Sequence, residues 1–117
     1  MKKIYYLKTC DTCRRIMKSF SLDGFEFQEI KTQPISLSQL EELFVLSGSY
    51  ESLFSRRAKK YSSMGLKDQT LSETDYKQLI LSDYTFLKRP VIIIDQNIFI
   101  GSDKKTLQQL KEHFLVN

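Results

Sequence analysis

The sequence contains few cysteine and histidine residues and no long apolar run. Only two of its 117 residues are cysteine, one is histidine and none is tryptophan. A four-ligand zinc site needs a second cysteine pair or spaced histidines, so no metal site is expected, and His113 is predicted to be a surface or half-buried helix residue. No apolar run approaches the roughly 20 residues that span a bilayer. The sequence therefore predicts neither a membrane segment nor a signal peptide, and a cytoplasmic location is the expectation.

The charge balance is only mildly basic. Lys and Arg total 18 and Asp and Glu total 14, which gives a net charge of +4. The cations are scattered, and no basic stripe interleaved with aromatic residues occurs, so direct nucleic-acid binding is not expected. A solvated surface with lysine in excess is the simpler interpretation, and a polyanionic partner is the alternative.

The first thirty residues follow a strand–helix–strand pattern. Residues 4–7 are β-branched, aromatic or apolar, which is typical of a short buried strand. Residues 12–20 carry apolar side chains at helical spacing, and residues 25–30 largely alternate between apolar and polar side chains. The sequence therefore predicts a β-α-β unit whose first strand-to-helix turn contains both cysteines.

The middle of the chain, about residues 36–83, is predicted to be an all-helical insertion. Residues 36–39 match a capping box, and a leucine-rich stripe follows them. Residues 53–61 favour a further short helix, and residues 72–75 open another. No part of this block has a strand pattern.

The last third of the chain returns to strands. Residues 91–95 are a β-branched run, which predicts a buried central strand with Pro90 at its first position. A turn at residues 96–97 and a strand at residues 98–100 would complete a hairpin, and a last helix follows Gly101. The order β-α-β, helical insertion, β-β-α is the thioredoxin-like arrangement of an α/β fold with a mixed sheet.

The size and this order favour a single domain over residues 1–117, because one hydrophobic core suits a chain of this length. Its strands are expected to run parallel in the first unit and antiparallel in the final hairpin.

The two cysteines lie in the segment KTCDTCR at residues 8–14. In the cytosol a CxxC is rarely a permanent disulfide. Beside a β-α-β pattern it indicates a redox-active pair, and two small buried residues in a turn are the alternative. Cys10 precedes the helix, where free N–H groups and neighbouring cations favour a thiolate, and Thr12 would donate its hydroxyl or cap the helix. Cys13 lies one turn further on the same side, as a resolving cysteine would.

A second candidate feature is the dipeptide Arg89-Pro90. Thioredoxin-like folds carry a cis-proline beside the active cysteine at this place, and the inference rests on the fold because X–Pro bonds are cis in only about 5% of cases. Arg89 would then lie close to Cys10, where its planar guanidinium suits a tetrahedral oxyanion. If the thioredoxin-like fold is not assumed, the simpler interpretation is that Arg89 is a surface residue at the start of a strand. Arg56 and Arg57 would then belong to a solvated helical face.

Four segments, taken in their order and spacing, resemble the ArsC/Spx family, which comprises arsenate reductases of the glutaredoxin-coupled type and their relatives. They are YYLKTCDTCRR at 5–15, LFSRRAKKY at 53–61, GLKDQTLSETDYKQLIL at 65–81 and LKRPVIIIDQNIFIGSDKKTLQQL at 87–110. The resemblance covers nearly the whole chain. It implies a thioredoxin-like fold with a helical insertion, no bound cofactor, and glutathione or glutaredoxin as the reductant.

The resemblance also implies roles for individual residues. Cys10 matches the catalytic cysteine that attacks arsenate, and glutathione and glutaredoxin resolve the adduct. Arg57 matches an oxyanion-binding arginine, with the adjacent Arg56 as the alternative. The expected catalytic residues are Cys10, Cys13, Arg57 and Arg89, and the expected substrate-binding residues are Thr12, Arg57, Arg89 and Pro90.

The chain departs from the reductase pattern at two places. Arsenate reductases of this type have a third arginine shortly after the last strand, whereas residues 99–103 contain none, and this argues against arsenate in particular. Lys104 and Lys105 supply charge there but lack the bidentate guanidinium. Many of these reductases also lack a cysteine equivalent to Cys13, while Spx regulators use a CxxC as a redox switch and bind the RNA polymerase α subunit.

Three functional hypotheses follow from these patterns. In the first, the favoured one, the protein is a thiol-dependent oxidoreductase in which Cys10 attacks an oxyanion or an oxidised thiol and Cys13, glutathione or glutaredoxin resolves the adduct. In the second, a Cys10–Cys13 disulfide switches an Spx-like regulator that binds the RNA polymerase α subunit. In the third, a family member has kept the fold and lost the activity.

Overall fold

The computed structural model describes the backbone of residues 1–116 and the side chains of residues 1–114. The chain divides into two compact units. The sheet unit comprises Met1–Gln33 and the described residues from Arg89 onward, and the helical unit comprises Pro34–Lys88. In the described part of the chain, no helix combines the length and the apolar character that a membrane crossing requires. The expectation of a single domain stays a prediction.

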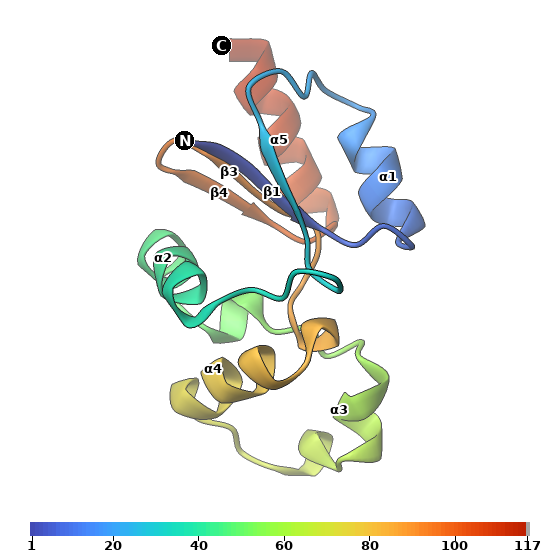
Figure 1. Ribbon diagram of the computed structural model, residues 1–117, viewed down its shortest axis with the longest axis vertical. Helices are drawn as coiled ribbons and strands as arrows, with labels where there is room; N and C mark the ends of the chain where they lie inside the picture. The colour runs from blue at the N-terminus through green and yellow to red at the C-terminus, as the bar shows by residue number, and fades with distance from the viewer. Residues whose placement is uncertain (117) are drawn as a thin grey trace. The chain divides into compact units, whose positions relative to one another are not determined.

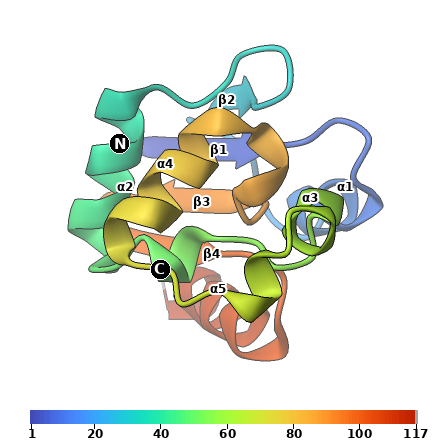
Figure 2. The same cartoon turned by 90° about the horizontal axis from the view of Figure 1, so that it is seen from below.

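The sheet unit is built on a mixed four-stranded sheet with the strand order β2-β1-β3-β4 (Figure 2). Strand β1 pairs in parallel with β2 and antiparallel with β3, and β3 pairs antiparallel with β4. The predicted thioredoxin-like order and mixed sheet are therefore confirmed. The elements are β1 (Lys2–Tyr6), α1 (Asp11–Met17), β2 (Glu26–Glu29), β3 (Val91–Ile94), β4 (Asn97–Ile100) and α5 (Lys104–Val116).

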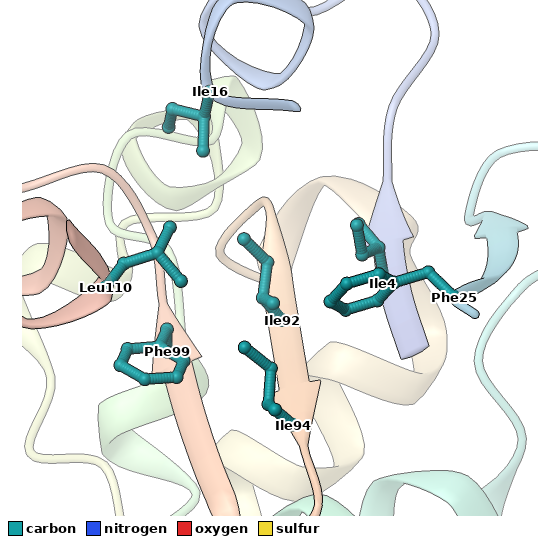
Figure 3. Packing of buried hydrophobic residues seen from close by; sticks show 7 residues of the cluster. All are labelled: Ile4, Ile16, Phe25, Ile92, Ile94, Phe99 and Leu110. Atoms are coloured by element: carbon teal, nitrogen blue, oxygen red, sulfur yellow. The ribbon is translucent and has the colours of Figure 1, made fainter. Parts of the chain in front are cut away.

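The core of the sheet unit lies between one face of the sheet and the helices α1 and α5 (Figure 1). All four residues of β3 are buried, as expected of a strand with a neighbour on each side. Ile92 and Ile94 are two residues apart and so face the same side of the sheet. Figure 3 shows the buried cluster that they form with side chains from both helices, from β1 and β4 and from the residue before β2: Ile4, Ile16, Phe25, Ile92, Ile94, Phe99 and Leu110.

Several boundaries of the sheet unit differ from the prediction, and the hairpin turn lies at residues 95–96 instead of 96–97. Helix α1 ends at Met17 and does not continue to residue 20, because the backbone N–H and the hydroxyl of Ser19 both donate to the Ile16 carbonyl and turn the chain. Pro90 precedes β3 and does not open it. Gly101 has φ 79°, a left-handed conformation that glycine adopts without a Cβ penalty. Its N–H donates to the Pro90 carbonyl at 2.9 Å, which closes the end of the hairpin.

The helical unit contains helices and 3₁₀ turns, with one isolated β-bridge between Phe54 and Leu87. The described elements therefore agree with the helical insertion that the sequence predicts for about residues 36–83. They are α2 (Leu37–Ser47), η1 (Glu51–Leu53), α3 (Lys59–Ser63), η2 (Leu66–Asp68), α4 (Glu73–Ser82) and η3 (Tyr84–Phe86).

The prediction of a helix over residues 53–61 is wrong for its central part. Residues 54–58 are not helical, because the backbone there pairs with the segment that follows η3. The Ser55 N–H donates to the Phe86 carbonyl at 2.7 Å, and the Lys88 N–H donates to the Leu53 carbonyl at 2.8 Å. The fully buried Phe54 ring also stacks on Phe86 with the ring centroids 5.2 Å apart. Tertiary pairing outweighs the local helical pattern here.

Capping boxes begin α2 and α4, and the first confirms the prediction for residues 36–39. At α4 the Asp75 N–H donates to the Ser72 hydroxyl at 3.2 Å, and the Ser72 N–H donates to the Asp75 carboxylate at 2.9 Å.

We expect Ser72→Ala to lower the free energy of unfolding by about 1 kcal/mol, because the Asp75 N–H loses its acceptor. Urea denaturation measures the change. The exposed Ser62→Ala in α3 is the control, and equal midpoints for the two variants would contradict the prediction.

Candidate functional site

Cys10 is the residue that caps helix α1. Its backbone is extended, with φ −89° and ψ 110°, and its Sγ accepts a hydrogen bond from the Cys13 N–H at 3.4 Å. Its own N–H donates to the Leu7 carbonyl at 3.1 Å, and its carbonyl accepts from the Arg14 N–H at 3.2 Å. The cap is therefore a sulfur atom, and the alternative in which Thr12 caps the helix is wrong.

The surroundings of Cys10 lower its pKa from the ordinary value of 9.0. Burial is the largest single influence and acts in the opposite direction, because it disfavours the charged thiolate. Hydrogen bonds from the backbone and the thiol of Cys13, the positive charge of Arg89 and the Thr12 N–H together outweigh it. Donors at the start of α1 and the charge of Arg89 therefore favour the thiolate of Cys10, and its role as a nucleophile stays a prediction.

Cys13 has the opposite character. Its side chain is fully buried, whereas Cys10 is partly exposed, and the two are not joined in a disulfide. Burial raises the pKa of Cys13 to about 12, and the hydrogen bond to Cys10 and the negative charge of Cys10 raise it as well. A hydrogen bond from the Leu7 backbone and the charge of Arg89 act in the other direction. The pair thus combines an accessible sulfur that ionises readily with a buried thiol that keeps its proton.

Arg89 belongs to the sheet unit with the two cysteines. The Arg89–Pro90 peptide bond is cis, which confirms that part of the prediction. The half-buried Arg89 acts electrostatically on both sulfurs, since its charge lowers the pKa of Cys10 and of Cys13. Pro90 is buried and leads directly into β3.

Glu29, at the end of β2, holds the loop that contains Cys10. Its carboxylate accepts hydrogen bonds from the Lys8 N–H at 2.9 Å, the Thr32 N–H at 2.9 Å and the Lys31 N–H at 3.1 Å. Arg14 Nη1 donates to the Lys8 carbonyl at 3.1 Å, so the N–H and the carbonyl of Lys8 are both hydrogen-bonded to side chains. The sequence analysis missed Glu29, because only the parallel pairing of β1 with β2 brings it beside Lys8.

We expect Glu29→Gln to loosen this loop while the sheet stays folded. The backbone donors lower the pKa of Glu29 from 4.5, first of all through the Lys8 N–H. Because the pKa of Glu29 is lowered, its ionised carboxylate stabilises the folded state above pH 4.5. This stabilisation is lost as the pH falls through the lowered pKa. Amide hydrogen exchange at Lys8 should become roughly threefold to tenfold faster, because a charge-assisted acceptor is replaced by a neutral one.

The exposed Glu26→Gln on the same strand is the matched control for this prediction. Exchange at Lys8 should stay at the wild-type rate in that variant. Equal acceleration in both variants would show that Glu29 does not act specifically on the cysteine loop.

The two arginines of LFSRRAKKY lie in the helical unit and differ from each other. Arg56 Nη2 donates to the Glu51 carboxylate at 2.8 Å and to the Tyr76 hydroxyl at 3.0 Å. Its hydrogen bond to Glu51 is the largest of the influences that raise the pKa of Arg56. Arg57 is exposed, and its guanidinium makes no hydrogen bond or ion pair with the described residues. Of the two, Arg57 is therefore the one available to a ligand, and its action at Cys10 stays a proposal.

The single histidine is a helix residue, as the sequence predicts. His113 is half-buried on α5 and packs edge-on against Phe99 and Phe114, with ring centroids 5.8 and 5.7 Å apart. Among the described side chains, no group of three or more His, Cys, Asp and Glu residues is arranged to hold a metal ion.

Comparison with known proteins identifies the family. The ArsC family model matches residues 5–110. The uncharacterized protein YusI of Bacillus subtilis (strain 168) is 30% identical over 102 residues, which cover 83% of this chain and 86% of YusI. The global transcriptional regulator Spx of Streptococcus pyogenes serotype M1 is 26% identical over 112 residues, 92% of this chain and 83% of Spx.

A solved structure supports the same assignment. The crystal structure of a possible arsenate reductase from Streptococcus mutans UA159 is 26% identical and superposes with a TM-score of 0.73 over 95% of this chain and 98% of that one. The fold, with its cysteine at the first strand-to-helix turn and its cis-proline before β3, agrees with a family match that spans most of the sequence. The chain belongs to the ArsC family.

Proposed function

We propose that the protein is a thiol-dependent oxidoreductase in which Cys10 is the nucleophile. The contrast between the two cysteine pKa values carries this proposal, since the pKa of Cys10 is lowered and that of Cys13 is raised to about 12. The thiolate is the reactive form of cysteine. Cys10 is also partly exposed while Cys13 is buried, so attack on an external substrate falls to Cys10.

In the first step the Cys10 thiolate attacks an oxidised thiol or an oxyanion. With a disulfide, the new bond joins Cys10 Sγ to one substrate sulfur, and the other sulfur leaves as a thiolate that takes a proton from water. With an oxyanion such as arsenate, Sγ bonds to the central atom, and one hydroxyl takes a proton from solvent and leaves as water. Arg89 stabilises the negative charge at this place, and Arg57 is proposed to bind the oxyanion through its planar guanidinium.

In the second step a thiol attacks Cys10 Sγ. For a disulfide substrate the second thiol is released, and for arsenate the electron pair of the S–As bond reduces As(V) to As(III). The hydrogen bonds that the backbone N–H and the thiol of Cys13 make with Cys10 support Cys13 as the attacking thiol. Burial is the largest influence that raises the Cys13 pKa, and it persists after Cys10 is covalently bonded, whereas the negative charge of Cys10 and the hydrogen bond to it are lost. Glutathione or glutaredoxin then reduces the Cys10–Cys13 disulfide, or attacks the adduct in place of Cys13.

The experiment measures turnover with two substrates. The reduced protein is supplied with arsenate, glutathione and glutaredoxin, or with 2-hydroxyethyl disulfide and glutathione alone. NADPH loss through glutathione reductase reports the rate, and Cys10→Ser is the control. Turnover of either substrate that disappears in the control supports the proposal and identifies the substrate class. Absence of both activities in the reduced wild-type protein would overturn it.

A redox-switched regulator is the second candidate, favoured by the match to the transcriptional regulator Spx over 92% of this chain. In this role a Cys10–Cys13 disulfide would alter a surface that binds the RNA polymerase α subunit. A pull-down with purified α subunit compares the oxidised wild type, the reduced wild type and Cys13→Ser. Retention of the oxidised wild type alone supports the switch, and retention of none of the three rejects it.

A further inference from the structure

A groove of about 560 Å³ lies between α1 and α5 in the sheet unit, and eight residues line it. Neither cysteine is among them, so the groove is separate from the thiol pair. Its volume falls within the range of roughly 300–1,000 Å³ that is typical of small-molecule sites. Figure 1 shows the two helices on the same side of the sheet.

The interior of the groove is apolar. Ile16 and Leu110 are buried at its base, and Figure 3 shows both side chains reaching into the core cluster. Phe20 and Phe114 stack on each other with ring centroids 4.9 Å apart, and Leu107 contributes the remaining apolar surface. An aliphatic chain lying in the groove would therefore contact hydrocarbon on both helices.

The charged residues that line the groove are of one sign. Arg15 comes from α1 and Lys111 from α5, and no Asp or Glu is among the lining residues. Both cations are exposed, and neither makes a hydrogen bond or an ion pair with another described residue. The nearest acid in sequence, Glu112, accepts a hydrogen bond from Gln108 at 3.0 Å. Neither cation of the groove is therefore engaged in a described ion pair, and both can attract an anionic ligand.

We propose that this groove binds a small amphipathic anion, specifically an unbranched acyl carboxylate. The chain lies along the apolar interior, and the carboxylate pairs with Arg15 and Lys111, where the arginine offers a bidentate contact. The size of the groove favours a small ligand over a protein, because a stable protein interface takes about 20–30 residues on each side. Eight residues line this groove. The inference is independent of the proposed thiol chemistry.

The test uses decanoate as the probe, with octanoate and decanol for comparison, in titration calorimetry on the full chain. Decanoate should bind with one-to-one stoichiometry. Octanoate should bind more weakly, by up to roughly fourfold for each methylene removed. Decanol should bind roughly tenfold more weakly than decanoate, because it lacks the charge-assisted pairing. Absence of decanoate binding, or equal affinity for decanol, would overturn the proposal.

Charge variants locate the site. Arg15→Gln and Lys111→Gln should each weaken decanoate binding by about tenfold, whereas Lys105→Gln, on the same helix but outside the groove, should leave it unchanged. Thermal unfolding confirms that each variant is folded. Cys10→Ser should bind decanoate like the wild type, which separates this result from the outcome of the turnover assay. An equal loss in Lys105→Gln and Lys111→Gln would show nonspecific attraction to a basic surface and reject the site.

Discussion

Cys10→Ser is expected to reduce thiol-dependent turnover by at least about a thousandfold, to the rate without protein. A serine hydroxyl does not ionise near neutral pH, so the donors that stabilise the Cys10 thiolate have no anion to act on. The helix cap survives in this variant, because the serine oxygen accepts from the Cys13 N–H as the sulfur does. The fold should therefore be retained, and circular dichroism checks this.

The pH dependence of alkylation tests the same assignment without a substrate. Iodoacetamide should label the wild-type protein at one site, at a rate that rises through a pKa below 9.0, because the surroundings of Cys10 favour the thiolate. Cys13→Ser should keep this labelling, and Cys10→Ser should lose it, since Cys13 is buried with a pKa of about 12. Labelling of Cys13 before Cys10 would contradict the proposed roles.

The features predicted correctly from the sequence are those with local signals. The run of residues 91–95, the alternation in residues 25–30 and the capping box at Ser36 each depend on neighbours within a few positions, and each element is present. The place of Cys10 at a strand-to-helix turn follows from the same local patterns. The thioredoxin-like order is then nearly determined, because few arrangements of these elements bury all their apolar faces.

The features that the sequence did not predict depend on contacts between distant segments. The Leu53–Tyr61 stretch has a helical pattern, yet pairing with Phe86 and Lys88 keeps residues 54–58 out of a helix. From the sequence alone, Glu29 is interpreted as an ordinary strand residue. Only the pairing of β1 with β2 shows that its carboxylate accepts a hydrogen bond from the loop that contains Cys10. The groove between α1 and α5 has no sequence signature, because Arg15 and Lys111 come together only through the packing of two helices.

Arg89 is expected to have two separable effects on the proposed reaction. Its charge lowers the pKa of Cys10, so Arg89→Gln should move the alkylation profile to higher pH. Its guanidinium is also proposed to stabilise the oxyanion of the reacting substrate. Removing a comparable donor from an enzyme costs about 10²- to 10³-fold in turnover, and we expect a loss of that size in Arg89→Gln.

Arg89→Lys distinguishes the two effects, because lysine keeps the positive charge and lacks the planar pair of donors. If both operate, Arg89→Lys should have an alkylation profile close to that of the wild type and a turnover close to that of Arg89→Gln. Lys18→Gln, which removes an exposed cation at the other end of α1, controls for a general loss of positive charge. An unchanged alkylation profile in Arg89→Gln would show that the guanidinium does not act on Cys10. Full turnover in Arg89→Lys would show that charge alone suffices, and Arg57 would then be the remaining candidate for bidentate binding of the oxyanion.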